Sequence, residues 1–337
     1  MLRRKFRPKK LSDQTIVITG ASSGIGLATA QMAAQRGASV VLTSRNEPEL
    51  QRVVRDINDA GGRATYAVAD VANAEELDAV ADEAVRSFGS VDTWVNNAGV
   101  SIYGKLTEVP LADKKRLFDV NFWGVVNGCR TAVNHMRDRG GTIINIGSIV
   151  SDQAVPLQGI YSASKHAVQG YTNALRMELE HDKFPISVSL VKPSAIDTPY
   201  LEHARNYMES APNFPPPVYA PEVVASTILK CAERPVRDIT VGGGGRMMAI
   251  MGAMAPRMTD KYMESTMFSQ QKDPEGRNRT MDSLYSPKRD GRRTGPYGGH
   301  VMQSSAYTRA KMSSVTQALP WIAAAAVFAA GVRRYQG

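Results

Sequence analysis

The sequence has few cysteines and histidines, and this scarcity excludes several classes of protein. Cys129 and Cys231 are the two cysteines in 337 residues, and they lie far apart, outside any CxxC or CxxH pattern. This spacing argues against a disulfide framework and against a zinc site, so no metal is predicted. The basic start MLRRKFRPKK is not followed by the apolar stretch of a secretory signal. We therefore expect a cytoplasmic protein in a reducing compartment.

The middle of the chain also lacks an excess of positive charge. The formal net charge is +9, and residues 1–10 hold six basic and no acidic side chains. Residues 11–245, in contrast, hold 21 basic and 26 acidic side chains. An acidic body argues against a nucleic-acid groove built into the fold, so no nucleic-acid partner is predicted. The basic ends either bind an anionic surface or are solvated tails.

Short apolar runs alternate with helix-like stretches through most of the chain. Strands are predicted at QTIVITG, ASVVLTSR, Ala64–Ala69, Val91–Asn96, GTIINIGS and ISVSLVKP. Helices are predicted between them, at GLATAQMAAQRGA, Pro48–Ala60, Ala74–Phe88, Ala112–Arg139 and Tyr161–His181. Such alternation predicts an α/β fold with one doubly wound, Rossmann-type parallel sheet covered by helices on both faces. We place this domain at residues 11–245, after a basic N-terminal arm of residues 1–10.

The composition changes after residue 245. Residues 246–268 predict a methionine-rich helical extension, with seven methionines between Met247 and Met267. These methionines either form a lid over an apolar substrate or pack in a core or dimer contact. Residues 269–311 are rich in Gly, Ser, Arg and Pro and predict a disordered linker.

The chain ends in an apolar stretch. Residues 312–337 predict a terminal helix, in which Val315–Val332 are 18 residues without charge. That length is just enough to cross a hydrocarbon core. The helix is either a membrane anchor, spanning or shallow, or an alanine-rich helix that packs on a partner subunit.

The stretch TGASSGIG, residues 19–26, lies between a predicted strand and a predicted helix. In that setting glycines permit a tight turn, a close approach of a pyrophosphate and close helix–strand packing. The helix N-terminus adds unpaired N–H groups for phosphate, and two serines add hydroxyl donors. The alternative is a βα turn without a ligand. The predicted dinucleotide contacts are Gly20, Ser22, Ser23, Gly24, Ile25 and Gly26.

The end of the second predicted strand carries no acidic residue. An acid at this position selects NAD by binding the ribose 2′-hydroxyl. Here Ser44 and Arg45 occupy it, and a guanidinium can pair with a 2′-phosphate. The sequence therefore favours NADP(H) over NAD(H), although NAD(H) stays possible. The alternative is that Arg45 is an ordinary surface arginine without a role in cofactor binding.

YSASK, residues 161–165, follows Ser148 by thirteen residues. Residues i and i+4 share a helix face, so Lys165 can lie near the Tyr161 phenol. A nearby positive charge favours phenolate and lowers the phenol's pKa, which predicts Tyr161 as a general acid and base. Ser148 ends a strand and can donate a hydrogen bond to the same substrate oxygen, so Ser148 and Tyr161 are the predicted substrate contacts.

NNAG, Asn96–Gly99, closes the fourth predicted strand with small residues against which a cofactor can lie, at Asn97, Ala98 and Gly99. Together with TGASSGIG, Ser148 and YSASK it makes residues 11–245 resemble the short-chain dehydrogenase/reductase family. The resemblance implies a homodimer or homotetramer. It also implies that Asn121 is a fourth catalytic residue, beside Ser148, Tyr161 and Lys165, holding a water that relays protons from Lys165.

The same resemblance implies further cofactor contacts. They are Asp70 and Val71 at the adenine, Ile196 and Thr198 at the nicotinamide, and Tyr161 and Lys165 from the catalytic set. Ser194 stands where the family usually has glycine. The predicted function is NADP-dependent hydride transfer between nicotinamide and an apolar small-molecule carbonyl or secondary alcohol. The alternative is an NADP-binding scaffold or redox sensor without significant turnover.

Overall fold

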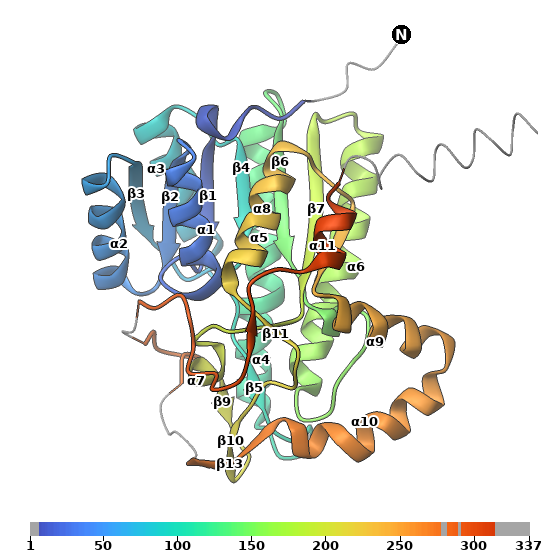
Figure 1. The fold of residues 1–337 in the computed structure, drawn as a ribbon. Helices are drawn as coiled ribbons and strands as arrows, with labels where there is room; N and C mark the ends of the chain where they lie inside the picture. The colour runs from blue at the N-terminus through green and yellow to red at the C-terminus, as the bar shows by residue number, and fades with distance from the viewer. Residues whose placement is uncertain (1–6, 278–281, 289–290, 314–337) are drawn as a thin grey trace, which may run out of the picture.

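The computed structural model describes residues 7–277, 282–288 and 291–313. At its centre lies a seven-stranded sheet in the order β12-β7-β6-β4-β1-β2-β3 (Figure 1). Its strands are β1 (Thr15–Thr19), β2 (Ser39–Ser44), β3 (Arg63–Val68), β4 (Thr93–Asn96), β6 (Gly141–Ile146), β7 (Ile186–Pro193) and β12 (Asp238–Val241). Every neighbouring pair is parallel. The predicted doubly wound α/β fold is confirmed.

Two hydrophobic cores lie on opposite faces of this sheet. One contains apolar side chains of α1 (Gly24–Gln35), α2 (Glu47–Asp59) and α8 (Pro221–Glu233). The other contains side chains of α3 (Ala74–Phe88), α5 (Gly124–Met136) and α6 (Gly159–His181). Because both faces are covered, strands such as β1 are buried along their whole length, which explains their continuous apolar runs.

The helix predicted at Ala112–Arg139 is interrupted near its start. The structure has α4 (Leu111–Phe118), a π-helical turn η2 (Asp119–Trp123) and then α5. Single π-turns inside helices often mark functional sites. This turn carries Asn121, whose side chain is buried.

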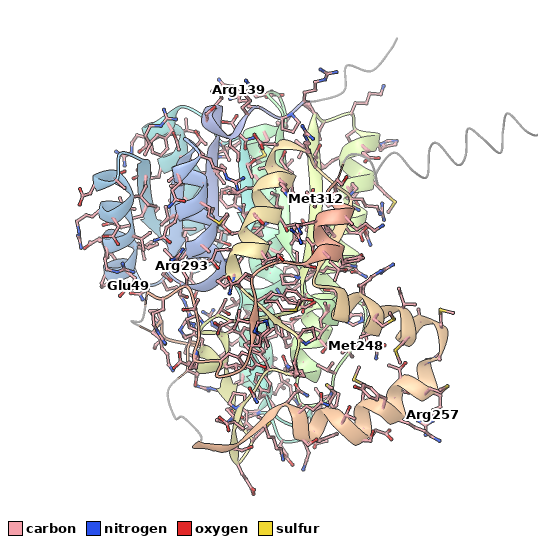
Figure 2. The ribbon with its side chains drawn as sticks, viewed as in Figure 1. Glu49, Arg139, Met248, Arg257, Arg293 and Met312 are labelled. Carbon is pink, nitrogen blue, oxygen red and sulfur yellow. The ribbon has the colours of Figure 1, made fainter. Side chains whose placement is uncertain are left out.

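The remaining short elements lie outside the central sheet. They are η1 (Leu11–Asp13), β5 (Ile102–Tyr103), η3 (Ile149–Ser151), β8 (Ala195–Ile196), α7 (Tyr200–His203), β9 (Arg205–Asn206), β10 (Ser210–Pro212) and β11 (Val218–Tyr219). The methionine-rich stretch forms α9 (Gly243–Met254) and α10 (Pro256–Gln270), a hairpin that projects from the body (Figure 1). Figure 2 shows Met248 on the α9 arm of this hairpin and Arg257 near the turn between its arms.

The described parts of residues 269–311 correct the expectation of a disordered linker. They contain β13 (Lys272–Arg277), β14 (Val301–Met302) and α11 (Ala306–Lys311). Residues 282–288 and 291–297, which we call the strap, return to the carboxyl ends of β1 and β2 (Figure 1). The segment has too few aliphatic residues for a core of its own, but it inserts Leu284 into the core that contains side chains of α3, α5 and α6, where Leu284 is 0% exposed.

The predicted terminal helix, residues 312–337, lies outside the described residues from residue 314 onward. Among the helices that the structure does describe, none has the length and apolar character needed to cross a bilayer.

Candidate active site

The glycine-rich turn after β1 has the geometry that a dinucleotide requires. Gly20 and Gly24 have positive φ angles of 66° and 54°, which favour glycine. A Cβ on Gly26 would lie 2.2 Å from the Gly20 carbonyl oxygen, so only glycine lets α1 begin this close to β1. The turn therefore presents the N-terminus of α1 toward the cleft at the strand ends.

Asn97 fixes this turn from the neighbouring strand. Its side-chain amide donates to the carbonyl oxygens of Thr19 at 2.9 Å and Gly20 at 3.2 Å. The backbone N–H groups of Asn97 and Ala98 both donate to the Thr19 hydroxyl at 3.0 Å. The NNAG motif thus braces the glycine-rich turn as well as offering a small-residue surface.

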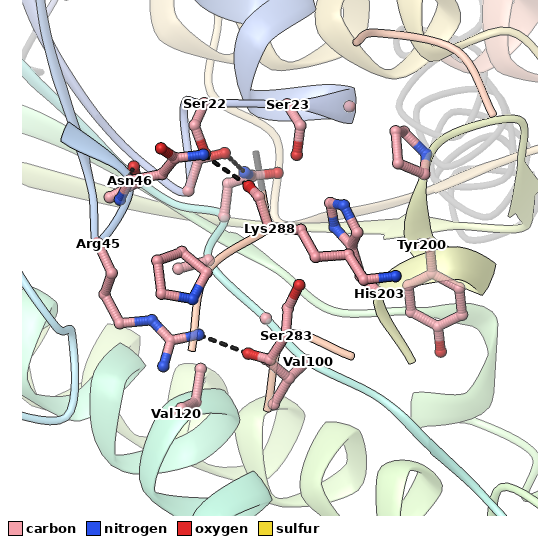
Figure 3. A pocket seen from close by; sticks show the side chains of 18 of the residues that line it. Ser22, Ser23, Arg45, Asn46, Val100, Val120, Tyr200, His203, Ser283 and Lys288 are labelled. Carbon is pink, nitrogen blue, oxygen red and sulfur yellow. Dashed lines mark hydrogen bonds between the residues drawn. The ribbon is translucent and has the colours of Figure 1, made fainter. Parts of the chain in front are cut away.

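An elongated cavity runs along the carboxyl ends of β1, β2 and β4 (Figure 3). Most of the predicted cofactor residues line it, namely Gly20, Ser22, Ser23, Gly24, Ile25, Ser44, Arg45, Asp70, Val71, Asn97, Ala98, Gly99 and Thr198. Gly26 lies behind this surface, and Ile196 lines a second, adjoining cavity. The residues present fit a dinucleotide, because the cavity is lined by the glycine-rich turn at the N-terminus of α1 and by Arg45 at the end of β2.

Arg45 is not a free surface arginine. Its guanidinium donates to the Ser283 carbonyl oxygen at 2.5 Å (Figure 3) and to the Tyr285 carbonyl oxygen at 2.9 Å. It also lies 3.9 Å from the Asp70 carboxylate, which is itself paired with Arg116. Burial lowers the pKa of Arg45, and its pairing with carbonyl oxygens leaves its positive charge in the cavity wall.

The second cavity brings Ser148, Tyr161 and Lys165 together. It shares Ile25, Asn97, Gly99, Thr198 and Tyr200 with the first cavity, so the two are contiguous. The Lys165 ammonium donates to the Ile146 carbonyl at 2.9 Å and lies 5.7 Å from the centre of the Tyr161 ring. The structure therefore places the Tyr–Lys pair on one side of one cleft.

The Tyr161 phenol does not follow the expectation of a lowered pKa. Burial raises its pKa, while hydrogen bonds with Tyr200 and Ser148 act to lower it. Burial also lowers the pKa of Lys165 to about 8. Desolvation penalises the charged form of both groups, and helical spacing alone does not reveal that burial.

Asn121 is fully buried behind the cleft and lines neither of its two cavities. Its side-chain carbonyl accepts from the Val100 N–H at 2.8 Å, and its amide donates to the Val100 carbonyl at 2.9 Å. A Cβ on Gly99 would lie 3.4 Å from the Asn121 carbonyl oxygen and 3.8 Å from the Lys165 nitrogen. Asn121 and Lys165 thus face the same glycine, and Asn121 fixes the loop that carries it.

Tyr200 is a site residue that the sequence patterns did not single out. Its hydroxyl donates to the Ser101 hydroxyl at 2.7 Å or to the Gln158 side chain at 3.1 Å. Its ring lies edge-on to the Tyr161 ring, with centroids 5.7 Å apart. The residue follows VKPSAIDTP in the sequence, and a tyrosine after a helix-capping proline carries no signal that distinguishes it.

The outer part of the second cavity is apolar. Its walls include Ile149, Val150, Val155, Phe214, Met248 and Met267. Met248 and Met267 come from α9 and α10, so the hairpin closes one side of this cavity, while Met254 and Met258 stay 81% and 73% exposed. Ser194 also lines it, and the Ser194 hydroxyl packs against Gly242 and Gly245. Within the described residues, no cluster of three or more His, Cys, Asp or Glu side chains offers a metal site.

Residues 14–209 match the short chain dehydrogenase family. The chain is 42% identical over 321 residues to the uncharacterized oxidoreductase YxnA of Bacillus subtilis, a match that covers 94% of this chain and 90% of that protein. It is 40% identical over 192 residues to 3beta-hydroxysteroid dehydrogenase 1 of Eggerthella lenta, covering 56% and 73%.

A solved short chain dehydrogenase/reductase from Burkholderia phymatum, in complex with NAD, superposes with a TM-score of 0.66 at 28% identity. The match covers 75% of this chain and 96% of that one. The family match alone spans more than half of the chain. The protein is therefore a member of the short-chain dehydrogenase/reductase family, an oxidoreductase of the kind that acts on alcohols and ketones.

Proposed function

We propose that the protein transfers hydride between NADP(H) and an apolar carbonyl compound or secondary alcohol, with Tyr161 as the general acid and base. The observation that carries the proposal is the half-buried Tyr161 phenol, which lines one cavity with Ser148 and Lys165 where the dinucleotide cavity meets the apolar one. When bound, the nicotinamide would supply or accept the hydride. The protein's own residues handle the proton and hold the substrate.

In the reductive direction Tyr161 donates its phenolic proton to the substrate oxygen. Ser148 donates a hydrogen bond to that oxygen and stabilises the charge that develops there. Lys165, held by the Ile146 carbonyl, places positive charge beside the phenolate that remains. Asn121 fixes the Val100 backbone and keeps Gly99 against the lysine. The direct test is NADPH oxidation with a panel of ketones and aldehydes, from small polar ones to large apolar ones.

The pKa directions predict opposite pH profiles for the two reaction directions. The pKa of Tyr161 is raised, so the phenol is protonated at neutral pH and carbonyl reduction is already at its plateau there. Alcohol oxidation requires the phenolate, so kcat/KM for oxidation rises about tenfold per pH unit. The slope becomes shallower above a pH of about 8, where Lys165 loses its proton. A Lys165→Arg variant keeps its positive charge, so its pH profile for oxidation should not become shallower above this pH. A pH-independent oxidation rate in the wild type would contradict the assignment of Tyr161 as the general acid and base.

The preference for NADP(H) is part of this proposal. The positive Arg45 side chain and the absence of an acid at the end of β2 support it. We expect Arg45→Ala to raise the Kd for NADPH roughly tenfold to a hundredfold while changing the Kd for NADH far less, because a charge-assisted hydrogen bond is lost.

Arg52→Ala is the matched control for the Arg45 variant. Arg52 also donates to the strap, at the Gly291 carbonyl (2.9 Å), but neither it nor its carboxylate partners Glu49 and Asp56 line the cofactor cavity. Its removal therefore loosens the strap without changing the charge of the cavity wall. If both variants weaken NADPH and NADH binding equally, the 2′-phosphate role of Arg45 is wrong.

A homodimer or homotetramer is a further part of the proposal. The helices that carry or flank Asn121 and Tyr161 expose apolar side chains, among them Leu111, Trp123 and Met177, which are 65%, 52% and 61% exposed. A contact between two copies across these helices would bury them.

A further inference from the structure

The strap contacts residues of the dinucleotide cavity both at the end of β2 and at the glycine-rich turn. Arg45 and Asn46, at the end of β2, donate to backbone carbonyls of the strap, and Ser283, Pro287 and Lys288 line the cavity itself. The end of β2 is where a dinucleotide fold holds the adenosine ribose. The first half of the strap therefore forms the outer wall of the adenosine end of the cavity (Figure 3).

The second half of the strap lies against the pyrophosphate end. The Arg292 carbonyl accepts from the Gly24 N–H at 2.8 Å, and the Gly295 N–H donates to the Asp197 carboxylate at 3.1 Å. A Cβ on Gly295 would lie 2.3 Å from the Thr198 carbonyl oxygen. Ser22 and Ile25 still line the cavity beside these contacts, so the strap covers this end without filling it.

Several contacts with other parts of the chain hold the strap in place. Asp282 pairs with Arg205 at 2.8 Å, and the Ser283 N–H donates to the His203 carbonyl at 2.9 Å. Leu284 is fully buried in the core. The Lys288 ammonium donates to the Glu202 carbonyl at 2.5 Å, which fastens the strap to α7 across the cavity. These contacts do not need a ligand, so the strap is part of the fold.

We propose that the strap is part of the cofactor site, where it roofs the bound dinucleotide and slows its release. The proposal rests on the proposed function, because it takes the cavity to be a dinucleotide site. Arg45, Asn46 and Gly24 are then held in position by strap carbonyls before the cofactor binds. A dinucleotide leaves its groove only when these hydrogen bonds open, so the strap sets how long the cofactor stays bound.

The test uses glycine and leucine variants of the full chain. Gly295→Ala pushes the strap off the Thr198 backbone, and Leu284→Ala removes its buried anchor. Neither residue contributes a side chain to the cavity. Gly298→Ala is the matched control, because a Cβ there would meet nothing within 4 Å. The readouts are the Kd of NADPH, followed by its fluorescence, and its dissociation rate after a chase with excess NADP⁺, which does not fluoresce.

We expect both variants to release NADPH at least about tenfold faster than the wild type, with a matching rise in Kd, and Gly298→Ala to behave as the wild type. Hydrogen exchange of residues 283–288 should slow in the wild type on adding NADPH and change little in the variants. Unchanged or tighter binding in both variants overturns the proposal, since tighter binding would mean that the strap competes with the cofactor. A wild type that binds neither NADPH nor NADH refutes the cofactor assignment itself, whereas normal wild-type binding with unaffected variants refutes the strap alone.

Discussion

Replacing Tyr161 by phenylalanine is expected to lower kcat/KM roughly 10²–10⁴-fold and to leave the Kd of NADPH nearly unchanged. In the proposed mechanism the phenol supplies the proton, whereas the cavity proposed for the dinucleotide is formed mostly by the turns after β1, β2 and β4. Steady-state kinetics with the best substrate of the panel, together with a fluorescence titration of NADPH, measures both quantities. Equal losses in turnover and in cofactor affinity would mean that the hydroxyl serves to hold the site together and not to move a proton.

Tyr171→Phe provides the matched control for this substitution. Tyr171 lies on the same helix, α6, and packs edge-on against Phe122, outside both cavities. The variant loses the same hydroxyl from the same type of residue, and its kcat/KM should stay close to the wild-type value. If the protein were a scaffold or redox sensor without turnover, Tyr161→Phe should leave its biological output intact. The Tyr161 variant therefore also distinguishes an oxidoreductase from a scaffold or sensor.

Replacing Gly26 by alanine is expected to weaken NADPH binding at least about tenfold and to lower the free energy of unfolding by about 1–3 kcal/mol. The added Cβ would lie 2.2 Å from the Gly20 carbonyl oxygen, so α1 and the glycine-rich turn must move apart. That movement displaces the N–H groups on which a phosphate would lie. Denaturant unfolding and a cofactor titration measure the two effects.

Gly170→Ala has the opposite expected effect on stability. Gly170 lies in the interior of α6 and is exposed, and an added Cβ there would meet nothing within 4 Å. Alanine at this position should raise the free energy of unfolding by about 0.5–1 kcal/mol and leave cofactor binding unchanged. If Gly26→Ala and Gly170→Ala have the same effects on stability and on cofactor binding, then close packing of α1 on β1 is not the reason that the turn needs glycine at position 26.

The fold could be read from the sequence because each strand and helix carries its own local pattern. β1 is β-branched and bounded by glycine, and α2 has a proline in its first turn. The proximity of Ser148, Tyr161 and Lys165 could also be predicted from the sequence, because strand ends meet at one edge of the sheet and residues i and i+4 share a helix face. What spacing could not show was burial, which reverses the expected direction of the Tyr161 pKa.

The C-terminal region departs from the sequence-based expectation for a related reason. Residues 269–311 contain few aliphatic side chains, and this composition indicates that they form no hydrophobic core of their own. The structure instead stabilises the strap with other parts of the chain, through Leu284 in the domain core and through carbonyl oxygens paired with Arg45 and Arg116. Backbone carbonyls carry no sequence signal, so these pairs could not be predicted. The position of Tyr200 could not be predicted either, because no sequence pattern distinguishes this tyrosine.

β14 has a consequence for how the protein is made. It pairs with β11, which pairs with β8, so Val301 and Met302 complete the small sheet that carries Ile196 over the cleft. Synthesis runs from the N-terminus, and contacts between residues this far apart in sequence form late. We therefore expect a nascent chain on the ribosome to display the glycine-rich turn and the Tyr–Lys pair long before it can retain a dinucleotide. We expect cofactor binding only after Val301 and Met302 have left the ribosome.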